Sequence, residues 1–250
     1  MFEPRLALAS LSGEADASWA RAGSDYAGCA FLGGVSLDRP TREAARELVA
    51  RDRNEFLPDD PIAFVDEQLT ALADTPIRPG VNVRTTSVGP LRETATVAAD
   101  HGAILEINAH CRQDELCAVG AGETLLADTN RLAEYVRAAS DAGATVSVKV
   151  RTEVSGVDLA ALAPELERAG ADCLHVDAMD SERVVADVRD ACSLFLVANN
   201  GVRDRATAQE YLEYGADAVS VGRPSDDPRV LRRVGAALAD LTGKRGEVRP

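Results

Sequence analysis

The stretch "DAGATVSVKVR" (141–151) decides the fold, because it joins the end of a helical pattern to a strand through one glycine. The same arrangement returns in "RAGADCLHVD" (168–177) and in "EYGADAVSVG" (213–222). A glycine just past the last helical turn is typical of a helix C-cap. The apolar residues that follow alternate with small or polar ones, which is the pattern of a strand. The three stretches therefore predict a chain built from repeated helix-to-strand units.

Eight short apolar runs of this kind occur along the 250 residues, and stretches with helical periodicity separate them. They cover residues 5–10, 28–33, 80–84, 103–108, 145–150, 172–177, 194–199 and 217–222. Eight strand–helix units in a chain of this length predict an α/β fold, the TIM (β/α)8 barrel. We expect a single domain over residues 1–250, with the barrel at about 5–240. The alternative, a doubly wound open sheet, would place a G-x-G-x-x-G turn after the first strand, and "LASLSGEADASW" has none.

Composition points to a cytoplasmic protein without a membrane span or a metal site. No uncharged apolar window reaches the length of about 18 residues that a spanning helix needs, and the first residues lack a signal-peptide pattern. The five cysteines are odd in number and scattered, which favours reduced thiols. Their spacing does not suit zinc, so we expect no metal.

The net charge of −14 argues against a generic nucleic-acid binder, because such a surface repels phosphate backbones. Nearly all positive charge comes from arginine, since the chain has just two lysines, Lys149 and Lys244. An acidic, lysine-poor surface is also typical of a salt-adapted, halophile-like cytoplasm, where concentrated cations screen self-repulsion.

The carboxyl ends of barrel strands carry the chemistry of this fold, so the residues at those ends are the candidates for the site. They are Ser10, Leu11, Ser12, Arg84, Asn108, His110, Cys111, Lys149, Arg151, His175, Asp177, Asn199, Asn200, Gly201, Gly222 and Arg223. Lys149 lies on the inward-facing side of its strand. A lysine there either reaches solvent or pairs with a carboxylate, or it stabilises an anionic cofactor or intermediate. We favour the functional role, because the chain uses so little lysine.

Two glycines and an arginine at the ends of the seventh and eighth strands predict a phosphate site. TIM barrels commonly bind phosphate there, through loop N–H groups. Gly201 and Gly222 allow close approach of the backbone, and Arg223 offers a forked donor. The alternative is that the glycines only make turns and Arg223 lies on the surface.

Cys111 and His175 each have a functional and a structural interpretation. Cys111 follows a strand in polar company, where a thiol acts as a proton donor or nucleophile, although most cysteines are buried core residues. His175 is equally consistent with a packed core histidine and with a ligand contact.

Several of these segments resemble the tRNA-dihydrouridine synthases, which are FMN-dependent TIM barrels. "EINAHCRQDELCAVGAGETLLAD" (106–128) is similar to the family's "(D/E)-I-N-x-G-C-P…G-x-G-x-x-L-L", and "VSVKVR" (146–151) to its "V-T-V-K-x-R". "VANNGVRD…EYGADAVSVGR" (197–223) resembles "N-G-x-I…G-x-D-x-V-M-I-G-R". The likeness spans almost the whole chain. Dihydroorotate dehydrogenases share the barrel and the flavin, and they are close competitors.

The resemblance implies a role for each matching residue. Cys111 matches the general acid that protonates the uracil carbon, and Lys149 is the second residue assigned to catalysis. Asn108 and Arg151 would contact the substrate base. FMN would be bound by Ser10, Leu11, Lys149, His175, Asn199, Gly201, Gly222 and Arg223. NAD(P)H is the implied electron donor, and the implied substrate is tRNA or a small pyrimidine.

The chain also departs from the family pattern. His110 replaces the usual Gly, Arg112 the usual Pro, Asp177 a common Arg and Asn200 a Gly. After Arg223 we expect one helix and a basic tail, "GKRGEVRP" (243–250), in place of the family's C-terminal helical domain. Three functions stay open: a reductase of the dihydrouridine-synthase type, a flavoenzyme acting on a small free pyrimidine or another ene substrate, and a flavin-binding barrel without catalysis.

Overall fold

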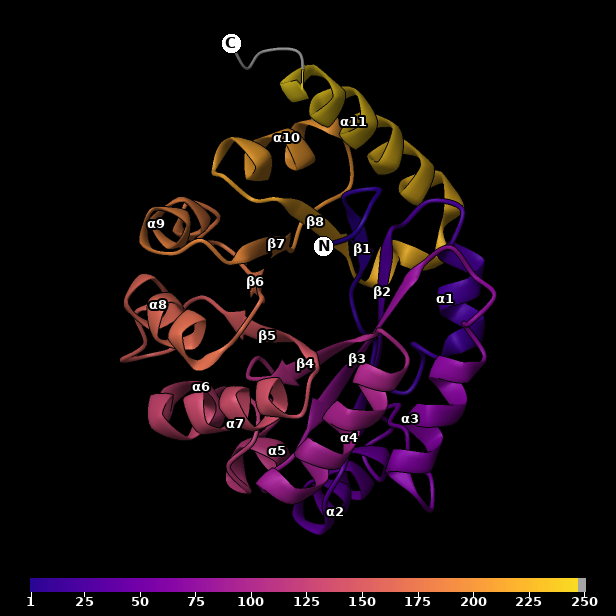
Figure 1. The fold of residues 1–250 in the computed structure, drawn as a ribbon, viewed down its shortest axis with the longest axis vertical. Coiled ribbons are helices and arrows are strands. Elements are labelled where there is room, and N and C mark those ends of the chain that lie inside the picture. Colours follow the sequence, from indigo (N-terminus) through magenta and orange to yellow (C-terminus); the bar gives the residue numbers. More distant parts are fainter. Residues whose placement is uncertain (247–250) are drawn as a thin grey trace.

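The computed structural model describes residues 1–246, and eight parallel strands close into a barrel within that range (Figure 1). The strands pair in sequence order, and β1 pairs with β8 to complete the ring. They are β1 Leu6–Leu8, β2 Cys29–Ser36, β3 Arg78–Arg84, β4 Ile104–Asn108, β5 Thr145–Arg151, β6 Cys173–Asp177, β7 Phe195–Asn199 and β8 Ala218–Val221. Each overlaps one of the eight predicted runs, so the predicted TIM barrel is confirmed. β2 extends beyond its predicted end, to Ser36.

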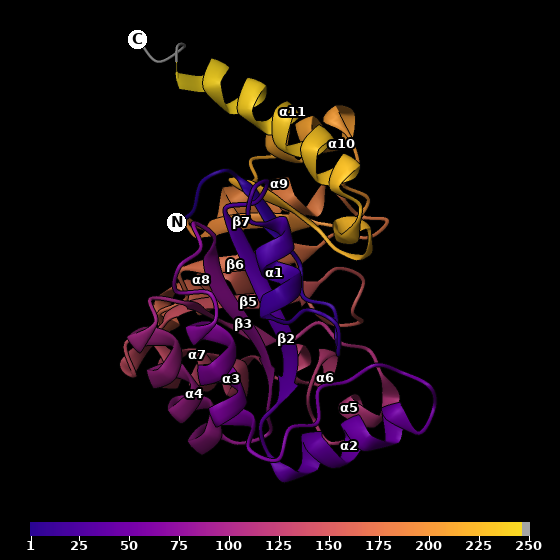
Figure 2. The same cartoon turned by 90° about the vertical axis from the view of Figure 1, so that its right-hand side faces the viewer.

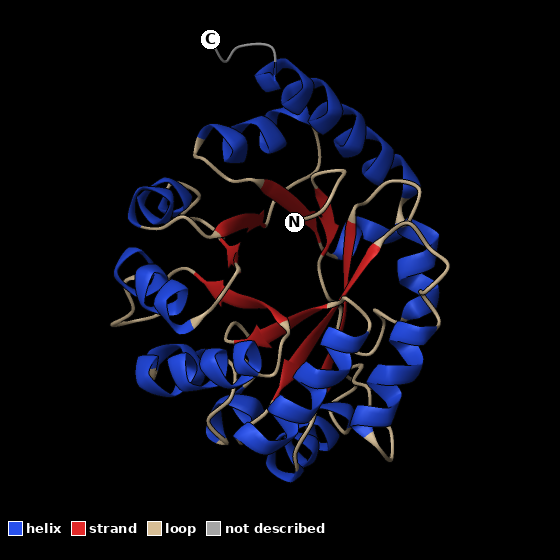
Figure 3. Cartoon of the chain, viewed as in Figure 1, coloured by secondary structure: helices blue, strands red, loops and turns tan. Residues whose placement is uncertain are grey.

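Helices surround the ring of strands on its outer side, as Figure 3 shows. They are α1 Ala17–Gly23, α2 Arg39–Val49, α3 Pro61–Thr70, α4 Val88–Asp100, α5 Asp114–Ala118, α6 Glu123–Ala127, α7 Thr129–Asp141, α8 Leu159–Ala169, α9 Val184–Ala191, α10 Arg205–Glu213, the short 3₁₀ turn η1 Arg223–Asp226 and α11 Pro228–Gly246. The end of the predicted basic tail, residues 247–250, lies outside the described residues.

The glycines at the helix-to-strand junctions adopt the conformation that the sequence predicts. Gly143, Gly170 and Gly215 have φ values of 89°, 103° and 92°, in the left-handed region that favours glycine. At Gly170 an added Cβ would lie 2.6 Å from Ser140 Oγ, so the junction also needs the missing side chain. Each junction turns the chain from an outer helix directly into the next inner strand.

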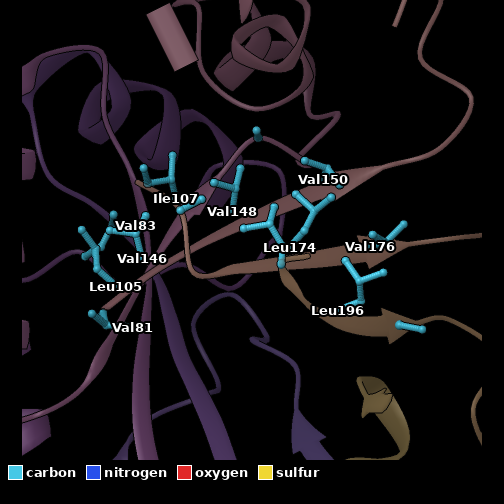
Figure 4. Packing of buried hydrophobic residues seen from close by; sticks show 14 of the residues in the cluster. Val81, Val83, Leu105, Ile107, Val146, Val148, Val150, Leu174, Val176 and Leu196 are labelled. Carbon is cyan, nitrogen blue, oxygen red and sulfur yellow. The ribbon is translucent and has the colours of Figure 1, made fainter. Parts of the chain in front are cut away.

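The outward faces of the strands carry the aliphatic core between barrel and helices (Figure 4). In β5 the residues Val146, Val148 and Val150 are buried in this layer, and the neighbouring strands add Leu105, Ile107, Leu174 and Val176. Because side chains alternate along a strand, Ser147 and Lys149 must then face the barrel interior. The outer aliphatic layer thus fixes which residues enter the barrel.

The long segment between β2 and β3 holds two helices, α2 and α3, as "LPDDP" (57–61) predicts. Asp60 caps α3 by accepting from the backbone of Ile62 and Ala63, and Pro61 begins the helix. Helix α2 lies beside α5 at one end of the barrel in Figures 1 and 2. Ala44 and Leu48 of α2 pack there against Leu116 of α5 and Ala121.

Candidate active site at the barrel mouth

Two adjoining cavities lie where the strands end, at the mouth of the barrel. The smaller has a volume of about 260 Å³ and is lined by the loops after β4 and α2, while the larger, of about 580 Å³, lies toward the ends of β7 and β8. Some side chains line both cavities and so stand at their boundary. They are Ser10, His110, Lys149, Asp177, Asn200 and Arg223.

Lys149 is buried at this boundary, and its amino group makes no direct polar contact. Its strand register places it between Asn108 of β4 and His175 of β6, and it is 3% exposed. No hydrogen bond or ion pair reaches its amino group from any residue in the described part of the chain. Its charge acts on Glu106 and Asp177 only at longer range. The amino group therefore keeps its hydrogen bonds for an anionic or strongly polar ligand at the cavity boundary.

Below Lys149 the barrel interior holds a polar network centred on Glu106, which is fully buried. One carboxylate oxygen accepts from Asn82 Nδ2 at 2.8 Å, and the other lies 2.7 Å from His175 Nδ1. Burial alone would raise the pKa of Glu106, but the charges of His175 and Lys149 and the hydrogen bonds hold it below its ordinary value. Glu106 therefore stays ionised and anchors the floor of the site.

His175 lies in this network and lines neither cavity. It is fully buried, and its Nε2 lies 2.8 Å from Ser220 Oγ, which donates to Asn199 Oδ1 at 3.0 Å. Burial lowers the pKa of His175, and the attraction of Glu106 offsets this only in part. His175 thus reaches the larger cavity through Ser220 and Asn199 instead of by direct contact.

Asn108 organises the loop that carries Cys111. Its Oδ1 accepts from the backbone N–H groups of His110 at 3.2 Å and Cys111 at 3.0 Å, and its Nδ2 donates to Asn82 Oδ1 at 2.8 Å. Cys111 lines the smaller cavity and also contacts the apolar cluster between α2 and α5. Asn108 therefore fixes where the thiol enters the cavity.

A second bonded cluster crosses the mouth above Lys149. His110 Nε2 lies 2.6 Å from Asp177 Oδ2, and Asn200 Nδ2 donates to Asp177 Oδ1 at 2.9 Å. Burial would raise the pKa of Asp177, but the hydrogen bond and charge of His110 and the bond from Asn200 hold it well below its usual range. Asp177 is therefore an anion at neutral pH.

The loop after α2 supplies residues that sequence analysis missed. Glu55 accepts from Arg84 Nη1 at 2.6 Å in a buried ion pair, and Arg84 also donates to Ser12. Arg53 of the same loop lines the smaller cavity with Arg112. No strand-end pattern marks Arg53 or Glu55, because their segment lies between two helices and reaches the mouth only through the fold.

The larger cavity has open space beside two glycines. A Cβ added at Gly201 or Gly222 would meet nothing within 4 Å in the described structure, and Arg203 and Arg223 line the same cavity. The backbone is thus accessible to a ligand next to two guanidinium groups, a donor set that suits phosphate.

The structure brings together most of the residues predicted for the site. Asn108, Cys111 and Arg151 line the smaller cavity; Leu11, Asn199, Gly201 and Gly222 line the larger; Ser10, Lys149 and Arg223 line both. Among residues 1–246 no group of three or more His, Cys, Asp or Glu side chains is arranged to hold a metal ion. None of the helices in that part of the chain has the length and apolar character that crossing a bilayer requires.

Comparison with known proteins identifies the family. The family model for dihydrouridine synthases matches residues 37–245. The chain belongs to the dihydrouridine synthase family. This match confirms the resemblance drawn from the sequence, and with it the predicted class of enzyme, an oxidoreductase.

Individual relatives differ in how much of them the chain covers. An uncharacterized protein of Methanocaldococcus jannaschii is 28% identical over 234 residues, which are 88% of this chain and 89% of the relative. A probable tRNA-dihydrouridine synthase of Rhodobacter capsulatus is 31% identical over 165 residues, 60% of this chain and 51% of that protein. The chain therefore spans about half the length of that named synthase.

Among solved structures, a morphinone reductase mutant in complex with tetrahydroNAD aligns with 91% of this chain and 86% of its own. The TM-score is 0.68 and the sequence identity 16%. At this identity the likeness shows a shared fold.

Proposed function

We propose that the protein is an FMN-dependent reductase of the dihydrouridine-synthase type, which adds a hydride and a proton to the carbon–carbon double bond of uridine. NAD(P)H is the proposed source of the hydride. Family membership supports this proposal, and the single observation that carries it is Lys149, a buried cation between two cavities whose amino group has no hydrogen-bond partner in the described part of the chain. A reduced flavin is an anion that such a cation stabilises.

The larger cavity fits FMN. Asn199, Gly201, Gly222 and Arg223 would hold its phosphate, and the backbone at Ser10 and Leu11 would pack under the ring system. Lys149 at the boundary would contact the edge of the ring. Bound FMN supplies the hydride, which the side chains of this protein cannot. His175 supports this site from below, through Ser220 and Asn199.

The smaller cavity fits one pyrimidine ring. Its volume of about 260 Å³ suits a single base, and Asn108 and Arg151 offer hydrogen bonds to the polar edge of such a base. The Sγ–H of Cys111 would donate the proton to the ring carbon, and solvent would return a proton to the thiolate. Asn108 orients this group through its bonds to the backbone of His110 and Cys111.

The substrate is proposed to be uridine within tRNA, in a cytoplasmic setting. The chain carries a net charge of −14, but five arginines line the small cavity beside Lys149, so the local field at the mouth attracts a phosphate-bearing substrate. They are Arg53, Arg84, Arg112, Arg151 and Arg223. A base within RNA would leave its stack to enter a cavity of this size. A free pyrimidine nucleotide offers the same charge and is the alternative that experiment must separate.

Purified protein tests the cofactor first. It is expected to be yellow and to release FMN, and Arg223→Ala is expected to weaken FMN binding by about 1.5–3 kcal/mol, the range for hydrogen bonds to charged groups. Fluorescence titration of apoprotein with FMN measures this. Arg229→Ala is the control, because its side chain on α11 is 89% exposed. Apoprotein that binds no FMN at micromolar concentration, in low or high salt, contradicts the proposal.

Substrate tests follow with the holoprotein. With NAD(P)H present, wild type is expected to form dihydrouridine in an unmodified tRNA transcript. Formation of dihydrouridine from uridine 5′-monophosphate alone would identify the free-nucleotide enzyme. Flavin binding without turnover of either substrate would leave a flavin-binding barrel.

A further inference from the structure

Three positions at which the chain departs from its family pattern meet in one bonded cluster. His110, Asp177 and Asn200 follow β4, β6 and β7, and they are far apart in sequence. The bonds of 2.6 Å and 2.9 Å that join them make Asp177 the centre of the cluster. The fold brings these strand ends to one mouth, and the two bonds join the three side chains into one unit.

The backbone at Asn200 supports such a role. Its φ of 96° lies in the left-handed region, which glycine adopts freely and other residues seldom do. Asparagine in that conformation keeps a strained backbone, and its side chain gains the bond to Asp177. The backbone strain at Asn200 thus accompanies a hydrogen bond that holds Asp177 in place.

His110 has one ring nitrogen bound and one free. Nε2 contacts Asp177, while Nδ1 has no hydrogen-bond partner among residues 1–246. The side chain is 26% exposed and lines both cavities. A carboxylate that orients an imidazole, whose other nitrogen faces a reactant, is the usual arrangement of a histidine that donates or accepts a proton.

Charged groups from several elements face His110. Burial lowers its pKa, the hydrogen bond and charge of Asp177 raise it, and Lys149 and Arg151 lower it further. Across the mouth Arg223 lines both cavities with His110. A negative charge that develops on a bound molecule would therefore draw a proton onto Nδ1.

We propose that His110, held by Asp177, donates a hydrogen bond from Nδ1 to the carbonyl oxygen of a substrate whose double bond is conjugated with that carbonyl. The inference rests on the proposed reductase function and names its substrate class. A hydride, which bound reduced FMN would supply, would form a C–H bond at the far alkene carbon. The alkene π pair would then form a double bond between the near carbon and the carbonyl carbon, and the carbonyl π pair would move onto the oxygen. Nδ1–H stabilises that charge. The near carbon then takes the proton of Cys111, and the thiolate regains one from solvent.

His110→Gln separates this role from a structural one. Glutamine retains a donor in the place of Nε2, so it preserves the bridge to Asp177, and it has no group in the place of Nδ1. The matched control is His101→Gln, because His101 Nε2 makes a similar contact of 2.7 Å with Asp66 away from the cavities. A thermal stability of His110→Gln equal to that of wild type would show that the bridge is intact.

The first measurement is the rate at which reduced holoenzyme is reoxidised without oxygen. Probes are unmodified tRNA transcript, uridine 5′-monophosphate and 2-cyclohexenone, with cyclohexene as the acceptor that lacks a carbonyl. With the probe that wild type reduces, His110→Gln is expected to lower the rate about 10²- to 10³-fold, as loss of one such donor does elsewhere. His101→Gln is expected to match wild type, and cyclohexene to be inert.

The pH dependence gives the second measurement. The wild-type rate is expected to rise as pH falls through the pKa of His110, and His110→Gln should lack this rise. Asp177→Asn removes the charge that raises this pKa, so the rise should move to lower pH. Ring ¹⁵N resonances of holoenzyme, assigned with His110→Gln, should show the same shift and should move at Nδ1 when uridine 5′-monophosphate is added.

The outcomes separate the inference from the proposed function. If none of the probes reoxidises the reduced wild-type holoenzyme, both the inference and the proposed function are wrong. If wild type and His110→Gln turn over at the same rate, and the Nδ1 resonance does not respond to uridine 5′-monophosphate, only the inference is wrong. The cluster is then a structural bridge.

Discussion

The two ends of the barrel interior are built on the same strands and differ in what they bury. At the amino-terminal end the inward residues are apolar and fully enclosed, and they include Phe2, Ala7, Cys29, Phe31, Ile104, Cys173, Val197 and Ala218. Above a middle layer that contains Glu106 and His175, the inward positions at the mouth are Asn108, Lys149 and Asp177. The closed end stabilises the fold by burial, whereas the mouth buries charges at a cost in free energy. The cost indicates that the mouth is kept for ligands.

Cys111→Ala tests the mouth with the largest expected effect. A proton donor acts only in the step that protonates substrate, so substrate turnover should fall by about two to four orders of magnitude while flavin reduction by NAD(P)H continues. Stopped-flow absorbance separates the two half-reactions. Cys192→Ala is the control, because Cys192 directly follows α9, is partly buried and lines neither cavity. Equal turnover by the alanine variant and wild type would make Cys111 a core thiol of the α2–α5 cluster.

Phe31→Ala tests the closed end. Phe31 is fully buried, its ring centroid lies 5.2 Å from that of His175, and Gly80 packs against it. The cavity left behind should lower the free energy of unfolding by about 3–5 kcal/mol. Urea unfolding measures the change, and Phe64→Ala, which is partly exposed on α3, should cost clearly less. FMN affinity that falls more than stability would contradict the division between the two ends.

The sequence predicts this division only in part. Alternation in β5 indicates that Ser147 and Lys149 face inward, and the glycines at the ends of helices mark where the next strands begin. Alternation does not give depth, which depends on the stagger of strands around the barrel. The flavin contact of His175 is implied by the family resemblance alone, and its side chain lies below both cavities and reaches the larger one through Ser220 and Asn199. The positions at strand ends predict that Asn108, Lys149 and Arg223 lie close together, because parallel strands end together at one mouth.

The contacts between loops could not be predicted from the sequence. His110, Asp177 and Asn200 were visible as departures from the family pattern, but nothing in their spacing shows that they bond to one another. Arg53 and Glu55 sit in a helix-connecting segment whose path over the mouth depends on packing of α2 against α5. Such positions are set by tertiary structure, and a single sequence carries no signal for them.

Lys149→Met is expected to change FMN affinity by an intermediate amount, and it tests whether a charge at the mouth serves the ligand or the fold. The substitution breaks no hydrogen bond, and the loss of the attraction to Glu106 and Asp177 is offset by the removal of a buried charge, so the free energy of unfolding of apoprotein should change by less than about 1 kcal/mol. FMN affinity should fall by about 1.5–3 kcal/mol, because a charged contact to the ligand is removed. Urea unfolding and FMN titration on the same preparation measure both. A variant that is strongly destabilised but binds FMN normally would make Lys149 a structural residue.

The smallest effect is the pH dependence of stability that Asp177 contributes. Its pKa in the folded protein is depressed, so the native state holds fewer protons than the unfolded state near the ordinary carboxyl value of about 3.9. The stabilisation is therefore complete above that value and is lost as pH falls through the folded pKa.

His110 affects stability at higher pH. Because its pKa is lowered in the folded protein, the unfolded chain takes up a proton first, so stability falls as pH drops below about 6.5. Asp177→Asn should flatten the stability profile below pH of about 4, relative to wild type, in urea unfolding measured at each pH. It should also steepen the loss near pH 6, because His110 without its anion is protonated less readily in the folded state. An unchanged profile would mean that Asp177 is as well solvated folded as unfolded, and the contrast between a charged mouth and an apolar closed end would lose its electrostatic basis.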